Sequence, residues 1–205
     1  NLLESENSNF TYDFSVLPSI SAMYHFNTNY SLEASVSKGF SVPTLEESLT
    51  EQGLFNKDLK PEEAWQYELV FSSTPFTWLT TSLKAYYIDV NNLIVARRVA
   101  EDQFVGINAG STNHPGLEAS LAGNFLLTNS LKLNVFANAS FNFYSFDQFI
   151  DGTQDFSENN LTGVPDRLFN VGFNLDHKAF NLSWNTNMVS RLPVNDANTV
   201  YTNSY

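Results

Sequence analysis

The sequence predicts an all-β protein: an antiparallel meander of about nine long strands that forms part of a transmembrane β-barrel. Two observations lead to this fold class. Apolar and polar residues alternate with a period of two over long stretches, which places one kind of side chain on each face of a strand. Tight turns and long connections also alternate along the chain. No stretch has convincing helical periodicity, and no run of 18 apolar residues that could form a transmembrane helix is present.

The clearest strand lies at residues 131–143. Its odd positions are all apolar, whereas its even positions carry Lys, Asn or Ser, apart from Phe136. Several such stretches are far longer than the about 5–6 residues typical of strands in soluble proteins. The expected strands are 9–15, 17–27, 30–40, 62–73, 78–95, 103–126, 131–147, 166–177 and 179–191.

The connections between these strands form two alternating classes. Each strand reverses the direction of the chain, so successive connections must lie at opposite edges of the sheet. We therefore expect all tight turns at one edge and all long loops at the other, as in bacterial outer-membrane barrels with short periplasmic turns and long extracellular loops. The tight turns fall near Thr28, Pro75, Asn129 and His177, and the long connections are 41–61, the tip at 99–103, 148–165 and the residues after 192.

A soluble β-sandwich is the alternative fold, because its strands also have one apolar face. In a sandwich the apolar residues would converge on one closed core, whereas in a barrel they would form exposed surface. Strand length, one-sided loops and aromatic residues near strand ends favour the barrel. The residues that distinguish the two folds are Leu133, Val135, Phe169, Val171, Leu182 and Trp184.

Composition argues against several functions. A net charge of −12 argues against general nucleic-acid binding, and the absence of cysteine excludes disulfides and thiol chemistry. The three histidines, His25, His114 and His177, are far apart in the sequence. The acidic pairs 46/47 and 62/63 are adjacent, so on an extended chain their side chains face opposite ways. We expect no metal site, no cofactor and no enzymatic activity.

Five segments, in chain order, resemble segments of the TonB-dependent outer-membrane receptors. Each is weakly diagnostic alone, and together they cover about residues 17–195. They are SVSKGFSVPTLEE (35–47), NKDLKPEEAWQYELVF (56–71), AYYIDVNNLIVARR (85–98), GINAGSTNHPGLEASL (106–121) and LTGVPDRLFNVGFNL (161–175).

The resemblance implies a 22-stranded barrel that is plugged by an N-terminal domain in the outer membrane of a Gram-negative bacterium. Residues 1–205 would be a partial barrel domain, without the plug and the final strands. The implied function is TonB-dependent uptake of a scarce ligand, most often a ferric siderophore or another iron complex. The implied partners are that ligand, TonB through the missing N-terminal region, and outer-membrane lipid, with no nucleic acid.

Arg97 and Arg98 are the candidate ligand-binding residues. They lie next to each other near a strand end, where they could reach an anionic ligand or could equally anchor to lipopolysaccharide phosphates. Three alternative functions stay open: an outer-membrane barrel hydrolase, a surface adhesin, or a soluble β-sandwich binding module. A hydrolase would need His25 or His114 beside a serine and a carboxylate at one rim.

Overall fold

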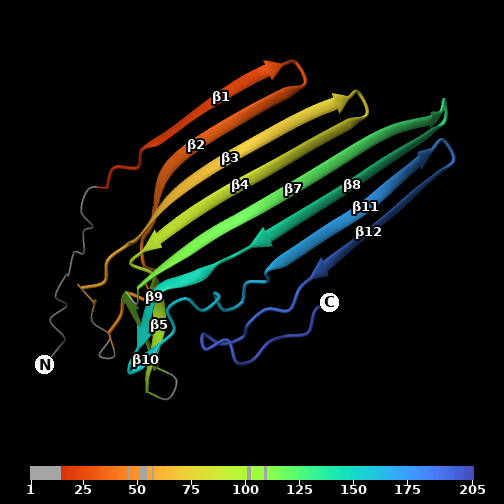
Figure 1. Ribbon diagram of the computed structural model, residues 1–205. Coiled ribbons are helices and arrows are strands. Elements are labelled where there is room, and N and C mark those ends of the chain that lie inside the picture. The colour runs from red at the N-terminus through yellow and green to blue at the C-terminus, as the bar shows by residue number, and fades with distance from the viewer. Residues whose placement is uncertain (1–14, 46, 51–54, 57, 101–102, 109) are drawn as a thin grey trace, which may run out of the picture.

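The computed structural model describes residues 15–45, 47–50, 55–56, 58–100, 103–108 and 110–205, and in these ranges every regular element is a strand (Figure 1). The expected strand at 9–15 lies almost wholly outside the described residues. The strands are β1 (Ser19–Asn27), β2 (Tyr30–Ser41), β3 (Glu62–Phe76), β4 (Leu79–Asn91), β5 (Ile94–Ala100), β6 (Gln103–Asn108), β7 (Gly110–Thr128), β8 (Leu131–Asn142), β9 (Ser145–Asp151), β10 (Gln154–Asp155), β11 (Arg167–His177) and β12 (Phe180–Val189).

Ten of these strands form one antiparallel sheet, in the order β1-β2-β3-β4-β7-β8-β11-β12, with β9 and β10 added beyond the end of β8. The β5–β6 hairpin is a separate two-stranded sheet. Spatial order follows chain order, which confirms the predicted meander. The outermost strands β1 and β12 do not pair with each other, so the sheet does not close on itself.

The connections lie at two opposite edges of the sheet, as expected. Four two-residue turns join β1 to β2, β3 to β4, β7 to β8 and β11 to β12, and all four lie at one edge (Figure 1). The other edge, called the loop edge below, carries the described residues of 42–61, the β5–β6 hairpin, β9 with β10 and the segment after them, and residues 190–204. For the described residues of 41–61, the prediction that this loop shares an edge with the other long connections is confirmed.

Three expected strands are each divided in the structure. Residues 78–95 fall on β4 and the start of β5, residues 103–126 form β6 and β7, and residues 131–147 form β8 and β9. The break between β8 and β9 lies opposite Pro115, because the last β7–β8 pair is Gly116 with Asn142 and the first β7–β9 pair is Asn113 with Ser145. Phe143 donates its N–H to the Pro115 carbonyl, but proline has no N–H to return the bond.

The sheet is a single layer with its apolar face uncovered. Among the described residues, the buried apolar side chains are Pro43, Leu59, Phe146, Phe149 and Pro193, and all five belong to the loop edge. Phe169, Leu182 and Trp184 are 37%, 52% and 50% exposed. This exposure contradicts a closed interior core, so the β-sandwich alternative is wrong. Within the described ranges, no helix is long and apolar enough to cross a membrane.

Candidate functional site

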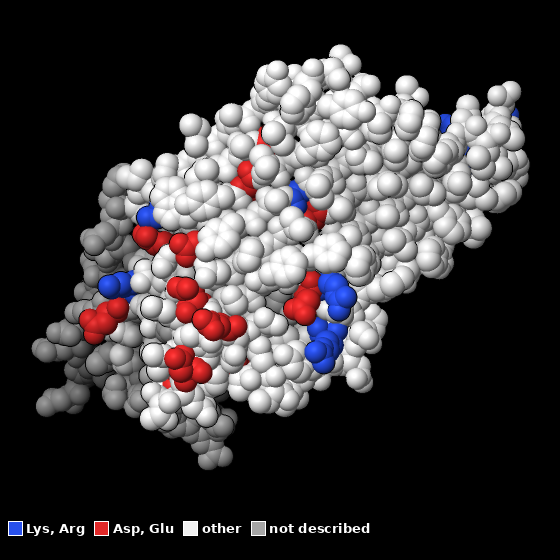
Figure 2. All heavy atoms as spheres, in the orientation of Figure 1, with Lys and Arg blue, Asp and Glu red and all other residues white. Residues whose placement is uncertain are grey.

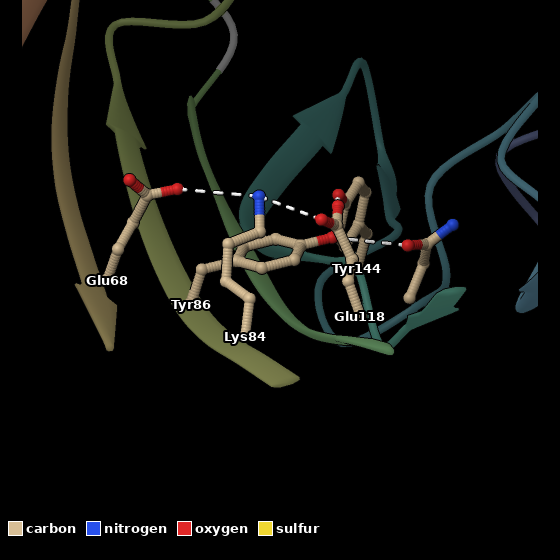
Figure 3. Close-up of polar contacts among 6 residues, drawn as sticks. Glu68, Lys84, Tyr86, Glu118 and Tyr144 are labelled. Atoms are coloured by element: carbon tan, nitrogen blue, oxygen red, sulfur yellow. Dashed lines mark hydrogen bonds and ion pairs between the residues drawn. The ribbon is translucent and has the colours of Figure 1, made fainter. Parts of the chain in front are cut away.

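The polar face of the sheet, opposite the exposed apolar face, carries an ion triad at its centre. Lys84 Nζ on β4 lies 2.8 Å from Glu118 Oε2 on β7 and 3.6 Å from Glu68 Oε1 on β3 (Figure 3). Lys84 and Glu118 are direct cross-strand partners, and Glu68 is the diagonal neighbour on the other side. One cation therefore holds two carboxylates across three strands.

A tyrosine pair extends this site toward the loop edge. Tyr86 follows Lys84 by two residues and so shares its face, and Lys84 Nζ lies 5.1 Å from the centre of its ring. The Tyr86 and Tyr144 hydroxyl oxygens are 2.6 Å apart, and the Tyr86 hydroxyl also donates to Asn142 Oδ1 at 3.2 Å. Buried Asn142 donates its Nδ2 to the carbonyl of Pro165 at 2.9 Å. This chain of contacts fixes the outer end of β4 against the segment that follows β10.

His114 lies beside this tyrosine pair. Its ring stacks on Tyr144 with centroids 4.6 Å apart, and its Nε2 lies 2.9 Å from the hydroxyl of buried Thr112. His25 pairs in register with Ser31 next to the β1–β2 turn, at the edge opposite the loops. In the parts of the chain that the structure describes, neither histidine is hydrogen-bonded to a carboxylate. The arrangement that a barrel hydrolase requires is therefore not formed by these residues.

Replacing Lys84 by methionine is expected to lower the free energy of unfolding of the receptor by up to about 1 kcal/mol, because two carboxylates lose the cation between them. The midpoint of urea unfolding measures this change. The double variant Lys84→Met/Glu118→Gln should recover part of the loss. Lys132→Met, at the turn edge, is the matched control. An equal loss in the control would contradict the triad's role.

The first long loop is held against β6. The Asn108 side chain accepts the Lys60 N–H at 2.8 Å and donates to the carbonyls of Lys60 and Asn92 at 2.9 and 2.7 Å. Nearer the start of the loop, Thr44 and Glu47 exchange side-chain-to-backbone hydrogen bonds, and the Glu47 carbonyl accepts the N–H of Gly106. The β5–β6 hairpin thus serves as a support for the loop after β2.

A second group of contacts joins two other loops. The Asn198 side chain accepts the Asn160 N–H at 2.8 Å and donates to the Asn160 carbonyl at 2.9 Å. The Thr162 hydroxyl donates to Asp196 Oδ1 at 2.5 Å, and the Gly163 N–H donates to the Pro193 carbonyl at 2.8 Å. We call this set the loop clasp. It fixes residues 159–163 to residues 193–198 at the loop edge.

Replacing Asn198 by alanine is expected to open the loop clasp. The side chain makes two hydrogen bonds to Asn160, worth about 1 kcal/mol each, so local stability should fall by about 1–2 kcal/mol and cleavage within 156–164 should rise roughly tenfold. Limited proteolysis measures this. Because Asn198 has a φ of 52°, Asn198→Gly separates lost hydrogen bonds from backbone strain. Asn203→Ala is the control, and unchanged cleavage in Asn198→Ala would contradict the clasp.

The loop edge is acidic. Figure 2 shows that the acidic side chains on the visible face gather toward this end of the molecule, whereas the turn end is nearly free of them. In β10, hydrogen bonds from the side chain and backbone of Ser157 lower the pKa of the Asp155 carboxyl. This carboxylate therefore stays charged below the usual titration range of aspartate. An anionic ligand approaching this edge needs specific cations for capture.

Arg97 and Arg98, the residues predicted to bind ligand, lie within strand β5 and not in a loop. They pair with Val105 and Phe104 of β6, in the hairpin at the loop edge. Their side chains lie outside what the structure describes, so their role stays a prediction.

Sequence reasoning missed the residues of the ion triad and the tyrosine pair as a group. Tyr86 and Tyr144 are visible in the sequence only as aromatic residues near strand ends. Lys84 and Glu118 come together through the register of β4 on β7, which pairs residues 34 positions apart. The alternation of the two strands gives the face of each side chain, and the register supplies the partner.

Taken together, a single-layer antiparallel meander, an exposed apolar face and a polar opposite face define the wall of a β-barrel. A model of the family described as "TonB dependent receptor-like, beta-barrel" matches residues 3–205. The chain belongs to this family, whose members are receptors and transporters of the outer membrane of Gram-negative bacteria. The resemblance noted in the sequence is thereby confirmed.

No curated protein matches the chain in sequence. Among solved structures, the ferric yersiniabactin uptake receptor FyuA from Yersinia pestis is similar, with 17% identity, a TM-score of 0.63, and coverage of 92% of this chain and 28% of FyuA. The copper transporter OprC has 14% identity and a TM-score of 0.68, with coverage of 91% and 29%. The RagAB peptide transporter has 14% identity and a TM-score of 0.64, with coverage of 88% and 30%. These likenesses show the fold, and the chain spans less than a third of each protein.

Proposed function

We propose that this chain is part of the barrel wall of an outer-membrane receptor that takes up a ferric siderophore or another iron complex by TonB-dependent transport. The observation that carries the proposal is the match to the receptor barrel family along nearly the whole chain. In this proposal the complete receptor has a barrel of 22 strands, a plug and a TonB contact. The plug and the TonB contact belong to other parts of the receptor.

The dimensions of the apolar face support a membrane location. On β3, the exposed aromatic residues Tyr67, toward the loops, and Phe76, at the turns, stand on either side of the apolar residues Leu69 and Phe71. They are roughly 30 Å apart along a strand that rises about 3.3 Å per residue. A tilt of about 40° reduces this distance to roughly 23 Å, close to the apolar band of about 25 Å in outer-membrane barrels. Next to the turns, the Trp78 ring stacks on Phe76 with centroids 5.2 Å apart and packs at a tilt against Phe125 with centroids 5.0 Å apart.

The cargo needs a separate argument, because similar folds serve a siderophore receptor, a copper transporter and a peptide transporter. We assign ligand contact to Arg97 and Arg98 of the β5–β6 hairpin, since cations at the acidic loop edge suit an anionic iron complex. Lys84 is a poorer candidate, because Glu68 and Glu118 already neutralise it. The tyrosine pair below the loops offers ring faces and hydroxyl groups along the ligand path.

Growth and uptake assays test this function. A deletion strain is supplied with single sources of ferric siderophores, haem, cobalamin, copper, glycans or peptides, and labelled uptake is measured for each. We expect loss of uptake of one ferric siderophore class, restored by the wild-type gene. Arg97→Gln/Arg98→Gln and removal of residues 42–61 should each reduce that uptake. Normal iron uptake in the deletion strain with loss of another cargo would overturn the iron assignment.

A further inference from the structure

The polar face of the sheet, which lines the lumen in the proposed receptor, has two chemically different halves that meet at β7 (Figure 1). The central part of β2–β4 and β7 carries three carboxylates and one ammonium group, namely Glu33, Glu68, Glu118 and Lys84. We call this the charged half. On β8, β11 and β12, by contrast, the ionisable side chains of this face are Lys132 and Asp176, and both lie next to the turns.

Six asparagine side chains stand on the second half in two rows, and within each row the three residues are direct cross-strand partners. The row nearer the loops is Asn138, Asn170 and Asn187, and the row nearer the turns is Asn124, Asn134 and Asn174. Along β8 and along β11 the two rows are four positions apart, which is about 13 Å at about 3.3 Å per residue. We call these six residues the amide wall.

The amides of this wall keep free hydrogen-bonding groups. Asn170 connects the row nearer the loops, because its Oδ1 accepts Asn138 Nδ2 at 3.3 Å and its Nδ2 donates to Asn187 Oδ1 at 2.5 Å. A carboxamide has two donors and two acceptor lone pairs, so these two bonds leave donors and acceptors unused. Asn138, Asn174 and Asn187 are exposed. The wall therefore offers both kinds of hydrogen-bonding group to the lumen without a charge.

The space beside the wall is open at its loop end. A hollow of about 240 Å³ lies there, and Ser120, Asn138 and Ser140 line it together with Lys84 and Glu118 of the triad. Between the two rows, Phe136 pairs with Gly172, and the tip of its ring lies over this glycine. A solute that leaves the hollow toward the turns thus meets asparagine side chains on either side of one aromatic ring.

Movement along a surface requires contacts that are favourable enough to admit a solute and weak enough to release it at each step. Hydrogen bonds to neutral amides meet this requirement, since water replaces them at little cost. The charged half does not meet it. Lys84 is already held by two carboxylates, and the excess of carboxylates there repels anionic groups and retains cationic ones.

We propose that the cargo crosses the lumen along the amide wall and not along the charged half, by exchanging hydrogen bonds with the two rows of asparagine. The groups recognised are the uncharged carbonyl, hydroxyl and amide groups at the surface of an iron complex. A complex that spans the distance of about 13 Å between the rows contacts the second row before it leaves the first. The proposal rests on the proposed function, which supplies the cargo.

One cross-strand row offers matched positions in the two halves. Ser31, Ser72, Ser82, Ser120, Asn138 and Asn170 are successive partners in it. Asn138→Leu/Asn170→Leu removes the amides at nearly constant volume. Uptake of the radioiron-labelled siderophore that the uptake assays identify should fall about tenfold, whereas its affinity for the purified full-length receptor should stay within about twofold of the wild type. Asn138→Gln/Asn170→Gln should retain most of the uptake, and Ser31→Ala/Ser72→Ala, in the charged half, should transport like the wild type.

Wild-type uptake in the double leucine variant would overturn the proposal, as would an equal loss in Ser31→Ala/Ser72→Ala. Heat modifiability in gel electrophoresis shows whether each variant assembles as a barrel. If the leucine variant does not assemble, Asn138→Asp replaces it: a carboxylate on the wall should slow uptake of an anionic complex more than Ser72→Asp does, and equal slowing would contradict the proposal.

The same measurements separate this proposal from the proposed function. If the wild-type receptor transports an iron complex and the assembled leucine variant transports it equally well, the amide wall is not the path and the proposed function stands. If the wild-type receptor transports no iron complex, the proposed function fails first and the proposed path fails with it.

Discussion

Replacing Gly110 by alanine is expected to detach β9 from the outer end of β7 and to cost about 3 kcal/mol or more of local stability. Gly110 has a φ of +145°, and an added Cβ would lie 1.7 Å from the carbonyl oxygen of Gln148. The backbone conformation alone costs an L-residue about 1–3 kcal/mol. The clash adds to this cost, because it involves backbone of β9 and no rotamer change relieves it. Phe149, which pairs with Gly110, would lose its strand pairing and its buried position.

Hydrogen exchange of residues 145–151, together with limited proteolysis, measures the loss at Gly110. Gly152 is a matched control in the turn after β9. It also has a positive φ, of 62°, but no atom lies within 4 Å of an added Cβ. Gly152→Ala should therefore lower local stability by about 1 kcal/mol, from backbone strain without a steric clash. If the two variants behave alike, the close approach of Gln148 to Gly110 is contradicted.

Replacing Gly172 by alanine is the second substitution expected to have a large effect, about 2 kcal/mol in the free energy of unfolding. An added Cβ would lie 2.6 Å from the backbone oxygen of Trp184 and 2.6 Å from Cζ of Phe136. Gly172 pairs directly with Phe136 across β11 and β8. Phe136 is the bulky apolar residue that interrupts the polar positions of 131–143, and its ring covers this glycine.

Urea unfolding of the receptor measures the cost at Gly172. Gly39, within β2, is the matched control because nothing lies within 4 Å of an added Cβ there, and Gly39→Ala should change stability by less than about 0.5 kcal/mol. In a Phe136→Ala background, Gly172→Ala should still lower the free energy of unfolding, because the clash with the Trp184 carbonyl oxygen persists while the clash with the Phe136 ring is gone. A cost at Gly172 no larger than at Gly39 would mean that β11 does not have this register.

The sequence predicts the local part of this fold. Alternation within a strand depends only on which face each residue occupies, so residues 131–142 and 180–189 are correctly identified as strands. The placement of the tight turns and the long loops at opposite edges follows because each strand reverses the direction of the chain. It requires no knowledge of strand register. The break between β8 and β9 could not be predicted from residues 143–144, because its cause, Pro115, lies on the neighbouring strand.

The candidate site was less predictable than the fold. Arg97 and Arg98 attract attention as adjacent cations, yet the groups that the structure brings together are separated along the chain. Tyr86 and Tyr144 are in contact although 58 positions separate them in the sequence, and Asn160 and Asn198 are separated by 38 positions. These contacts depend on register and on the paths of the long loops, neither of which is encoded by alternation.

The scarcity of buried apolar side chains changes how substitutions in this chain should be interpreted. Trimming the buried Phe149 leaves an empty volume inside the protein, as in the core of a soluble domain. Trimming Leu182 or Trp184 leaves none in the proposed membrane setting, because fluid lipid chains fill the space. The penalty there reduces to lost contact area with a liquid. The same truncation of an apolar side chain would therefore cost more stability at the loop edge than on the apolar face. The boundary between the two regions lies at the outer ends of the long strands.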